Sequence, residues 1–318
     1  MSTVDPEVGV VVPCHHDRQW PLLRRSIESV LAQRPAPARL IVAVDHNEPL
    51  RARLENAYPH VTVIANRYPR RGVSGNRNSG ARLLDTPLIA LLDGDAAAEP
   101  GWLAALTAPF ADPSVCGVGG AITPVWAGPR PRWVPDEFLW AWGGAYAGLP
   151  TTAGPVRNVW SASMAVRTEA FRAVGGFRVD FGKVGNLSRP EDTDLCLRLS
   201  RATGGIWWYA PDARVRHPVD ADKTLLRYFL GRCYQEGRGK IALARLNRGP
   251  ASLSSERGYL LGTVPRAILR GATAPLRGNA AALLPAAAML AGVGAAGCGA
   301  LVELTGGRRA SAARGGRR

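Results

Sequence analysis

The chain has 318 residues, of which 46% are hydrophobic and 20% are charged, and these are globular values that allow a full core. Its five cysteines stand singly, without metal-finger or redox spacing, which fits a reducing cytosol and argues against a disulfide framework. The first ten residues have neither a basic segment nor a long apolar one, so we predict no signal peptide.

Charge is distributed unevenly along the chain, whose net charge is +15. Residues 223–318 hold 16 Lys or Arg against 3 Asp or Glu, a net of +13, whereas residues 1–222 hold 24 against 22. We therefore predict two domains, a nearly neutral one at 1–222 and a basic one at 223–318. A basic segment of this kind suits nucleic acid or an anionic membrane surface.

Short apolar strands alternate with helices through the first part of the chain. The predicted strands lie at 8–13, 39–45, 61–66 and 88–92. The helices between them lie at 21–33, 49–59 and 75–85. Later helices are predicted at 100–111, 168–177 and 191–205, and later extended segments at 115–126 and 206–219. This order is typical of βαβ units, so we predict an α/β fold with a mostly parallel sheet.

The strand at 88–92 runs directly into two carboxylates, Asp93 and Asp95. In an open α/β sheet, the carboxyl end of such a strand faces the ligand crevice. Two like charges held close together repel each other, so the arrangement costs free energy unless a cation lies there. A simple polar turn is the alternative, because Asp-Gly-Asp is also good turn chemistry.

A glycine-rich, cationic stretch at 70–80 lies between Asp45 and Asp93, which both follow buried strands. It leads into a helix, so backbone N–H groups, the helix dipole and Arg71 or Arg77 form a candidate anion site. The stretch lacks G-K-[ST], which excludes a Walker loop, and it lacks G-x-G-x-x-G, which excludes a dinucleotide fingerprint.

Two further candidates come late in the chain. Glu191 and Asp192 open a helix, where acids are favoured on electrostatic grounds alone; the functional alternative is a carboxylate held rigidly as a general base. His217 follows an apolar extended segment, and a lone histidine there is more often packed or on the surface than a ligand.

In their order, these segments resemble glycosyltransferase family 2, whose members are inverting enzymes with the GT-A fold. The resemblance covers residues 8–217 and implies a mixed, mainly parallel Rossmann-like sheet flanked by helices, with a basic helical C-terminal extension. The matching features are strand ends at Pro13 and Asp45, "GVSGNRNSG", "DGD", "GGF" at 175–177, "ED" before a helix and a late "HP". The segments "WVPDEFLWAWGGAYAGLP" and "LRYFLGRCYQEGRGK" resemble a subgroup that includes glucosyl-dolichyl-phosphate glucuronosyltransferases.

The resemblance implies a site for Mn²⁺ or Mg²⁺ that would bridge the diphosphate of a nucleotide-sugar donor. Asp95 and His217 match the metal ligands, and Asp93 matches a contact to the ribose or to the metal. A cation there would neutralise both the paired acids and the departing nucleoside diphosphate. Family members often have an acid where this chain has Gly94, a departure that bears on metal affinity.

The resemblance also implies roles on the donor and acceptor sides. Asp45 would accept a hydrogen bond from the nucleobase, and Asp192, next to Glu191, would take the proton of an acceptor hydroxyl and so give inversion. The donor side would be lined by Pro13, Arg71, Asn76, Arg77 and Asn78. The Q-x-x-R-W motif of processive relatives is absent from "YQEGRGK", so we expect a single addition per encounter.

Other functions stay open as alternatives. A sugar nucleotidyltransferase would need a "GGxGTR"-type loop after the first strand, where this chain has "PCHHDR". An inactive nucleotide-sugar-binding or membrane scaffold protein would not need Asp93, Asp95, Asp192 and His217 together. For the basic segment we expect no nucleic-acid partner, because it has no such motif and its cations flank an apolar stretch, which suits lipid better.

That apolar stretch, at 280–302, carries no charge and is long enough to span a bilayer, which needs about 20 residues. It is mostly alanine and glycine, and arginines flank both sides, so the positive-inside rule disfavours a single span. We expect a hairpin, re-entrant or interfacial element with 259–277 as its basic amphipathic partner; a soluble helix packed on the first domain is the alternative. The sequence thus predicts an enzyme on the cytoplasmic side of a membrane, acting on a lipid-linked or cell-envelope glycan acceptor.

Overall fold

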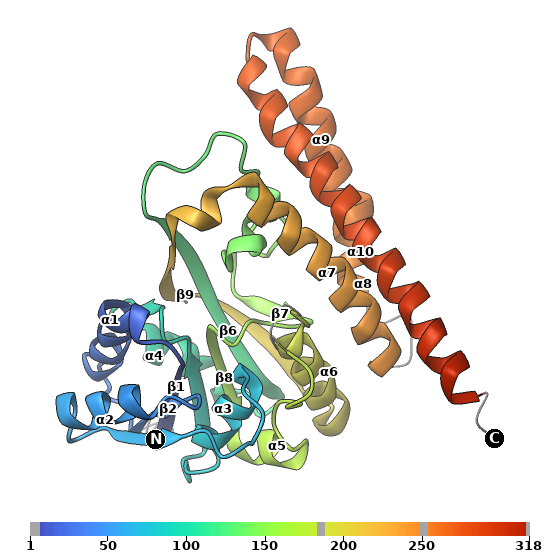
Figure 1. Cartoon of the computed structure of the whole chain (residues 1–318). Coiled ribbons are helices and arrows are strands. Elements are labelled where there is room, and N and C mark those ends of the chain that lie inside the picture. The colour runs from blue at the N-terminus through green and yellow to red at the C-terminus, as the bar shows by residue number, and fades with distance from the viewer. Residues whose placement is uncertain (1–6, 183–187, 248–253, 316–318) are drawn as a thin grey trace. The chain divides into compact units, whose positions relative to one another are not determined.

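The computed structural model describes residues 7–182, 188–247 and 254–315 of the chain (Figure 1). The chain divides into two compact units. Unit 1 comprises Met1–Val125, Pro150–Asn186 and Glu191–Pro218. Unit 2 comprises Trp126–Leu149, Leu187–Pro190 and Val219–Arg318. The predicted domain boundary between residues 222 and 223 stays a prediction; by contacts, residues 126–149 group with the basic segment.

Unit 1 is built on a mixed sheet whose strands follow the order β3-β2-β1-β4-β8-β6-β9-β5, with β7 paired to β9. The strands are β1 (Val8–Cys14), β2 (Arg39–Val44), β3 (Thr62–Ala65), β4 (Leu88–Leu92), β5 (Ala97–Ala98), β6 (Val115–Trp126), β7 (Gly154–Val156), β8 (Ser163–Arg167) and β9 (Ile206–Val219). The strands β3, β2, β1 and β4 pair in parallel. The pairs β4–β8, β6–β8, β5–β9 and β7–β9 are antiparallel.

Alternate residues of a strand point to opposite sides of the sheet, so the apolar strands of unit 1 have two faces to bury. Helices cover both of these faces. Val10 and Val12 of β1 belong to one core cluster and Val11 belongs to the other. The first face is covered by α1 (Trp20–Leu31), α2 (Glu48–Ala57) and α4 (Trp102–Thr107). The second is covered by α3 (Val73–Ala81), α5 (Thr168–Ala173) and α6 (Glu191–Thr203). The predicted α/β architecture is confirmed, and the parallel strands bring β1, β2 and β4 to one edge with their carboxyl ends together.

Unit 2 begins with a stretch rich in Trp, Pro and Gly, Trp126–Leu149, for which no secondary structure was predicted. Its aromatic side chains form a core of their own, in which the rings of Trp142 and Phe229 stack with centroids 5.6 Å apart. The helical elements are η3 (Asp136–Trp142), η4 (Ala221–Thr224), α7 (Leu226–Asn247), α8 (Ser254–Gly258), η6 (Tyr259–Thr263), α9 (Val264–Thr273), η7 (Ala274–Arg277), η8 (Ala280–Ala282) and α10 (Leu283–Gly315).

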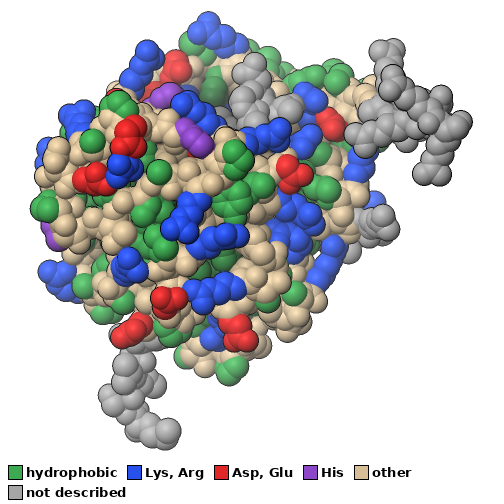
Figure 2. All heavy atoms as spheres, turned by 60° about the horizontal axis from the view of Figure 1, so that its bottom comes forward, with side chains coloured by type: hydrophobic (Ala, Val, Ile, Leu, Met, Phe, Trp, Pro, Cys, Tyr) green, Lys and Arg blue, Asp and Glu red, His purple; other side chains and the backbone are tan. Residues whose placement is uncertain are grey.

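One helical stretch among the described residues, Ala280–Gly306, has the length and apolarity to cross a membrane. Length and apolarity alone are weak evidence for a membrane span, because core helices of soluble proteins share them. Elsewhere the surface is mixed: on the face drawn in Figure 2, Lys and Arg side chains are spread among apolar ones.

Candidate active site

The loop after β4 is a tight turn that presents two carboxylates. The carbonyl oxygen of Asp93 accepts hydrogen bonds from Ser26 Oγ (3.2 Å) and from the backbone N–H of Ala96 (3.0 Å). At Gly94 a Cβ atom would lie 2.4 Å from the carbonyl oxygen of Pro13, so any side chain there would require the backbone to move. The close approach to Pro13 gives a physical reason for glycine where relatives often have an acid.

Asp93, Asp95 and His217 come together at this loop. Each can offer one ligand atom such that the three atoms lie within 4.8 Å of one another. His217 is carried by β9, which pairs with β5 so that Arg216 lies opposite Ala97. Its Nε2 atom lies 3.5 Å from Asp95 Oδ1. Two carboxylates and an imidazole are a suitable donor set for Mn²⁺ and, through the oxygens, for Mg²⁺.

Arg77 links this cluster to the start of α6. Its side chain is only 4% exposed, and Nη2 donates to Asp93 Oδ1 at 2.7 Å. Its Nη1 donates to Glu191 Oε1 at 3.4 Å and lies 3.8 Å from Asp192 Oδ1. Burial alone would lower the pKa of Arg77, but the three carboxylates raise it above its usual range. One permanently charged guanidinium therefore bridges the candidate metal ligands and the candidate base.

Glu191 and Asp192 are half-buried acids whose protons are held more tightly than usual. Burial and the charge of Asp192 raise the pKa of Glu191 to about 8, against the opposing effect of Arg77. Burial also raises the pKa of Asp192, while Arg77 and the Ser161 hydroxyl oppose the rise. A carboxylate with a raised pKa is a stronger base once it is ionised, as general-base catalysis requires.

The helix dipole explains why acids stand at the start of α6, but it does not explain where each one points. Asp194, in the same first turn, is fully buried and pairs with Arg178 (3.1 Å) and Arg198 (2.8 Å). The pair with Arg178 ties α6 to the segment that follows α5, whereas the pair with Arg198 lies within α6. Glu191 and Asp192 instead face Arg77, which separates them from the purely structural acid.

On the predicted donor side, Asp45 joins the end of β2 to the start of α3. Its two carboxylate oxygens accept hydrogen bonds from Asn66 Nδ2 (2.8 Å) and from the N–H of Gly72 (2.9 Å). Arg71 is held nearby, with Nη2 donating to the carbonyl of His46 at 2.9 Å. The nucleobase contact of Asp45 and the donor contact of Arg71 stay predictions.

Asn76 and Asn78 are buried and serve the scaffold. Asn76 Nδ2 donates to the carbonyls of Cys14 (3.2 Å) and Ala43 (2.7 Å), tying α3 to the ends of β1 and β2. The Asn78 amide donates to the carbonyl of Phe177 and accepts from its N–H. This pair of bonds explains the "GGF" motif, because Gly176 has a φ of 69° and lies so close to Asn78 that a Cβ would clash. The predicted donor contacts of both asparagines stay predictions.

The pairing of Arg77 with three carboxylates was not predicted from the sequence. Its predicted place on the donor side stays a prediction. The signal in the sequence was the start of a predicted helix, "GNRNSGA", with small and polar residues and one cation. The structure shows that residues 74–81 of α3 are all buried. A buried helix with one cation needs carboxylate partners, and these come from β4 and α6, far away in sequence.

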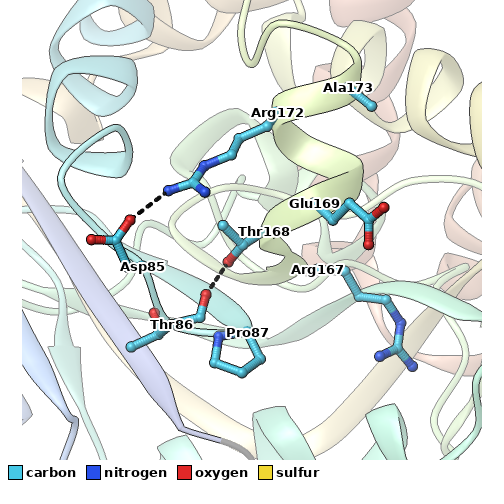
Figure 3. A pocket seen from close by; sticks show the side chains of 8 residues that line it. All are labelled: Asp85, Thr86, Pro87, Arg167, Thr168, Glu169, Arg172 and Ala173. Atoms are coloured by element: carbon cyan, nitrogen blue, oxygen red, sulfur yellow. Dashed lines mark hydrogen bonds and ion pairs between the residues drawn. The ribbon is translucent and has the colours of Figure 1, made fainter.

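A shallow depression elsewhere in unit 1 has no part in this site (Figure 3). It holds about 700 Å³ and lies at the opposite end of β4 from Asp93, where Leu88 pairs with Arg167. Its lining consists of Asp85, Thr86, Pro87, Arg167, Thr168, Glu169, Arg172 and Ala173.

Comparison with known proteins decides the family. Residues 9–175 match the model of the family described as glycosyl transferase family 2, which is more than half of the chain. The chain belongs to glycosyl transferase family 2. This confirms the resemblance found in the sequence, and this family 2 protein is a glycosyltransferase.

Two curated relatives refine the picture. The chain is 28% identical over 258 residues to a glucosyl-dolichyl phosphate glucuronosyltransferase of Haloferax volcanii, covering 80% of this chain and 82% of the relative. This confirms the predicted subgroup. The chain is also 29% identical over 231 residues to a pre-mycofactocin glycosyltransferase of Mycobacterium tuberculosis, and the match covers 71% of this chain but only 45% of that relative.

Solved structures confirm the GT-A type of fold. The mannosyltransferase PcManGT from Pyrobaculum calidifontis, in complex with GDP-Man and Mn²⁺, aligns with a TM-score of 0.61 and 18% identity, covering 95% of this chain and 88% of that one. GalNAc-T7 with UDP, GalNAc and Mn²⁺ aligns with a TM-score of 0.52 and 16% identity, covering 81% and 54%.

Proposed function

We propose that this family 2 glycosyltransferase is metal-dependent and inverting, and that it moves a sugar from a nucleotide-sugar donor to an acceptor hydroxyl in single additions. The observation that carries the proposal is the Asp93–Asp95–His217 cluster, joined through Arg77 to Asp192. Metal ligands and a base held by one guanidinium suit a reaction in which a diphosphate leaves while a proton is removed. The Mn²⁺ and nucleotide or nucleotide-sugar in the two aligned structures support the donor class.

Asp95, His217 and Asp93 would hold Mn²⁺ or Mg²⁺, whose positive charge stabilises the departing nucleoside diphosphate. Asp192 accepts the proton of the acceptor hydroxyl. The hydroxyl oxygen bonds to the anomeric carbon as the bond from that carbon to the diphosphate oxygen breaks, and attack opposite the leaving group inverts the configuration. Pro13, Asp45, Arg71, Asn76, Arg77 and Asn78 are proposed for the donor side, with Arg77 acting on the carboxylates.

We also propose a lipid-linked or cell-envelope glycan as the acceptor, and the cytoplasmic side of a membrane as the place of the reaction. The name of the Haloferax volcanii relative, which includes dolichyl phosphate, supports a lipid-linked acceptor. The long apolar stretch at Ala280–Gly306 supports contact with a membrane. Nucleotide-sugars are made in the cytosol, so unit 1 must be exposed there.

A panel of nucleotide-sugars, scored for release of the nucleoside diphosphate, tests the proposal. We expect release from one donor class in the presence of Mn²⁺ or Mg²⁺ and loss of release in excess chelator. Full activity in chelator would remove the metal from the proposal. Binding of a nucleotide-sugar by calorimetry, without turnover of any donor or acceptor, would favour an inactive nucleotide-sugar-binding protein instead.

A further inference from the structure

One face of the helix α10 packs on α7, and the opposite face is exposed. The helix runs in the same direction as α7, since Phe229 lies by Gly292 and Arg238 pairs with Glu303. The two backbones touch: a Cβ on Gly237 would lie 1.9 Å from the carbonyl oxygen of Ala296. The same holds for Gly299, whose Cβ would lie 2.0 Å from the carbonyl oxygen of Tyr234. Small residues thus fix this pair of helices at close range.

The opposite face of α10 is apolar and exposed. Only 22% of the apolar window in Ala280–Gly306 is buried. Leu283, Leu290 and Leu301 are all exposed, and their spacing of seven and eleven residues places them on one side of the helix. Ala287, Gly294 and Cys298 lie between them on the same side, so the stripe carries no charge.

The preceding helical segment, Ser254–Arg277, also exposes leucines and arginines. Leu261, Leu269 and Leu276 are exposed, the first and last by 82% and 88%. The arginines among them are exposed as well: Arg257, Arg266, Arg270 and Arg277. Apolar side chains bordered by guanidinium groups match the boundary between acyl chains and anionic headgroups.

The packing of α10 on α7 argues against a single membrane span. Arg238 of α7 pairs with Glu303 of α10 at 3.0 Å, and Lys240 pairs with Glu236 and with Glu256 at 3.1 and 2.8 Å. If α10 crossed a bilayer while packed on α7, these ion pairs would enter the hydrocarbon, at a cost of several kcal/mol per ion. An orientation in the plane of the membrane keeps α7 behind α10, on the aqueous side.

We propose that the exposed apolar stripe of α10, together with Leu261, Leu269 and Leu276, lies flat in the surface of an anionic membrane. This membrane contact rests on the proposed function, because a lipid-linked acceptor would require the enzyme to bind a membrane. Its test measures membrane binding and not turnover. The surface is specific in its chemistry: neutral vesicles supply the acyl boundary without the headgroup charge that the arginines need.

The native chain offers a probe near the C-terminal end of the stripe. Cys298 is exposed, whereas Cys14, Cys116, Cys196 and Cys233 are buried. The full chain labelled at Cys298 with an environment-sensitive maleimide dye is mixed with vesicles of phosphatidylcholine, with or without phosphatidylglycerol. We expect a blue shift with the anionic vesicles, reduced in high salt, and quenching by lipids brominated near the headgroup rather than at the chain end. No shift with either vesicle would overturn the proposal.

Variants separate lipid contact from a general effect of added charge. Leu290→Asp combined with Leu301→Asp should weaken binding to anionic vesicles by about tenfold or more, because each carboxylate opposes burial in lipid. Val125→Asp, which alters an exposed apolar residue of unit 1, should bind as wild type. Equal binding of the double variant and the wild type would contradict the proposed surface, provided that circular dichroism shows the same helix content.

Topology and self-association supply the remaining outcomes. In a Cys298→Ser background, Ala281→Cys and Thr305→Cys mark the two ends of the stripe. Reaction of both with an impermeant maleimide outside sealed vesicles supports the in-plane orientation, whereas protection of one end means a span and overturns it. A dye shift that appears without vesicles, rises with protein concentration and accompanies dimers in light scattering would assign the stripe to a second copy of the chain.

Discussion

Arg77 in unit 1 and Leu276 in unit 2 are opposite exceptions to the rule that apolar side chains are buried and charged side chains are exposed. The guanidinium is 4% exposed, and the leucine is 88% exposed. A buried charge is tolerated where carboxylates pair with it, and an apolar side chain is tolerated outside where another surface covers it. The comparison teaches that unit 1 buries charge where carboxylates pair with it, while unit 2 leaves apolar side chains exposed to solvent.

The strongest way to break the inward cluster is to remove a metal ligand. Asp95→Asn should lower turnover by about 10²–10³-fold, because the departing diphosphate loses its stabilising charge, while the melting temperature stays near that of wild type. The measurement is nucleoside diphosphate release together with the affinity for Mn²⁺. Asp85→Asn, an exposed acid at the other end of β4, is the matched control. Wild-type turnover of Asp95→Asn would remove Asp95 from the site.

Removal of the base should have a similar but acceptor-dependent effect. With a hydroxyl acceptor, Asp192→Asn should reduce turnover by about 10²-fold or more, since no other group is assigned to the proton. With an acceptor that is already an ionised phosphate, no proton must leave and the loss should be far smaller. A variant that remains nearly active on its acceptor would therefore refute the base role and point to a phosphate acceptor.

Arg77 tests whether the inward cluster is one unit. Arg77→Met should destabilise the protein by about 3–5 kcal/mol in thermal or chemical unfolding, because Asp93, Glu191 and Asp192 lose their shared counter-ion. Arg77→Lys keeps the charge but cannot reach three carboxylates at once, so it should stay folded and lose about tenfold in turnover with weaker Mn²⁺ binding. Arg172→Met, which breaks the exposed pair with Asp85, should cost at most about 1 kcal/mol. Equal stability losses at Arg77 and Arg172 would contradict the central role of Arg77.

The pH dependence sharpens the same picture. Asp192 must be ionised to act, and burial raises its pKa, so kcat/KM should rise with pH through a limb above the usual aspartate range. The charge of Asp192 helps to raise the pKa of Glu191 to about 8, so Asp192 ionises first and Glu191 is still protonated through this limb. Glu191→Gln should therefore leave the limb near its wild-type pH. Because the pKa of Glu191 is raised to about 8 in the folded state, its ionisation disfavours folding, and the wild type should lose stability as pH rises from about 4.5 to 8. The Glu191→Gln variant should lose less stability over that range. A limb that moves to lower pH in the variant would show that Glu191 ionises before Asp192 and would contradict this order.

The smallest effect concerns the loop between the two aspartates. Gly94→Ala should destabilise unit 1 by about 1–3 kcal/mol, because its Cβ would meet the carbonyl oxygen of Pro13 at 2.4 Å. Gly94→Asp should lower the stability of unit 1 at least as much and should not increase the affinity for Mn²⁺, although relatives often carry an acid there. Gly154→Ala, where a Cβ meets nothing within 4 Å, is the control for the loss of glycine itself. Tighter Mn²⁺ binding by Gly94→Asp would show that the loop can move.

Local patterns were sufficient for the architecture. The apolar runs at 8–12 and 88–92 predict buried strands because hydrophobicity and length are properties of a short segment, and both lie where expected. The same reasoning found β6 and β9 with the observed bounds, and the charge count separated the basic end of the chain. The motif order also gave the family, and it named Asp93, Asp95 and His217, whose side chains the structure brings together. Their role as metal ligands stays a prediction.

Only the tertiary structure decided which of these groups act on one another. The guanidinium of Arg77 meets acids 16 and 114 positions away, and no periodicity along the chain reports a contact of that range. Asn76 and Asn78 match a donor-binding motif, and only the folded chain shows that their amide nitrogens donate to backbone carbonyls inside the protein. Which face of α10 is exposed could not be predicted for a related reason. An alanine- and glycine-rich helix has no distinct apolar face of its own, and its packing on α7 selects the side that is left exposed.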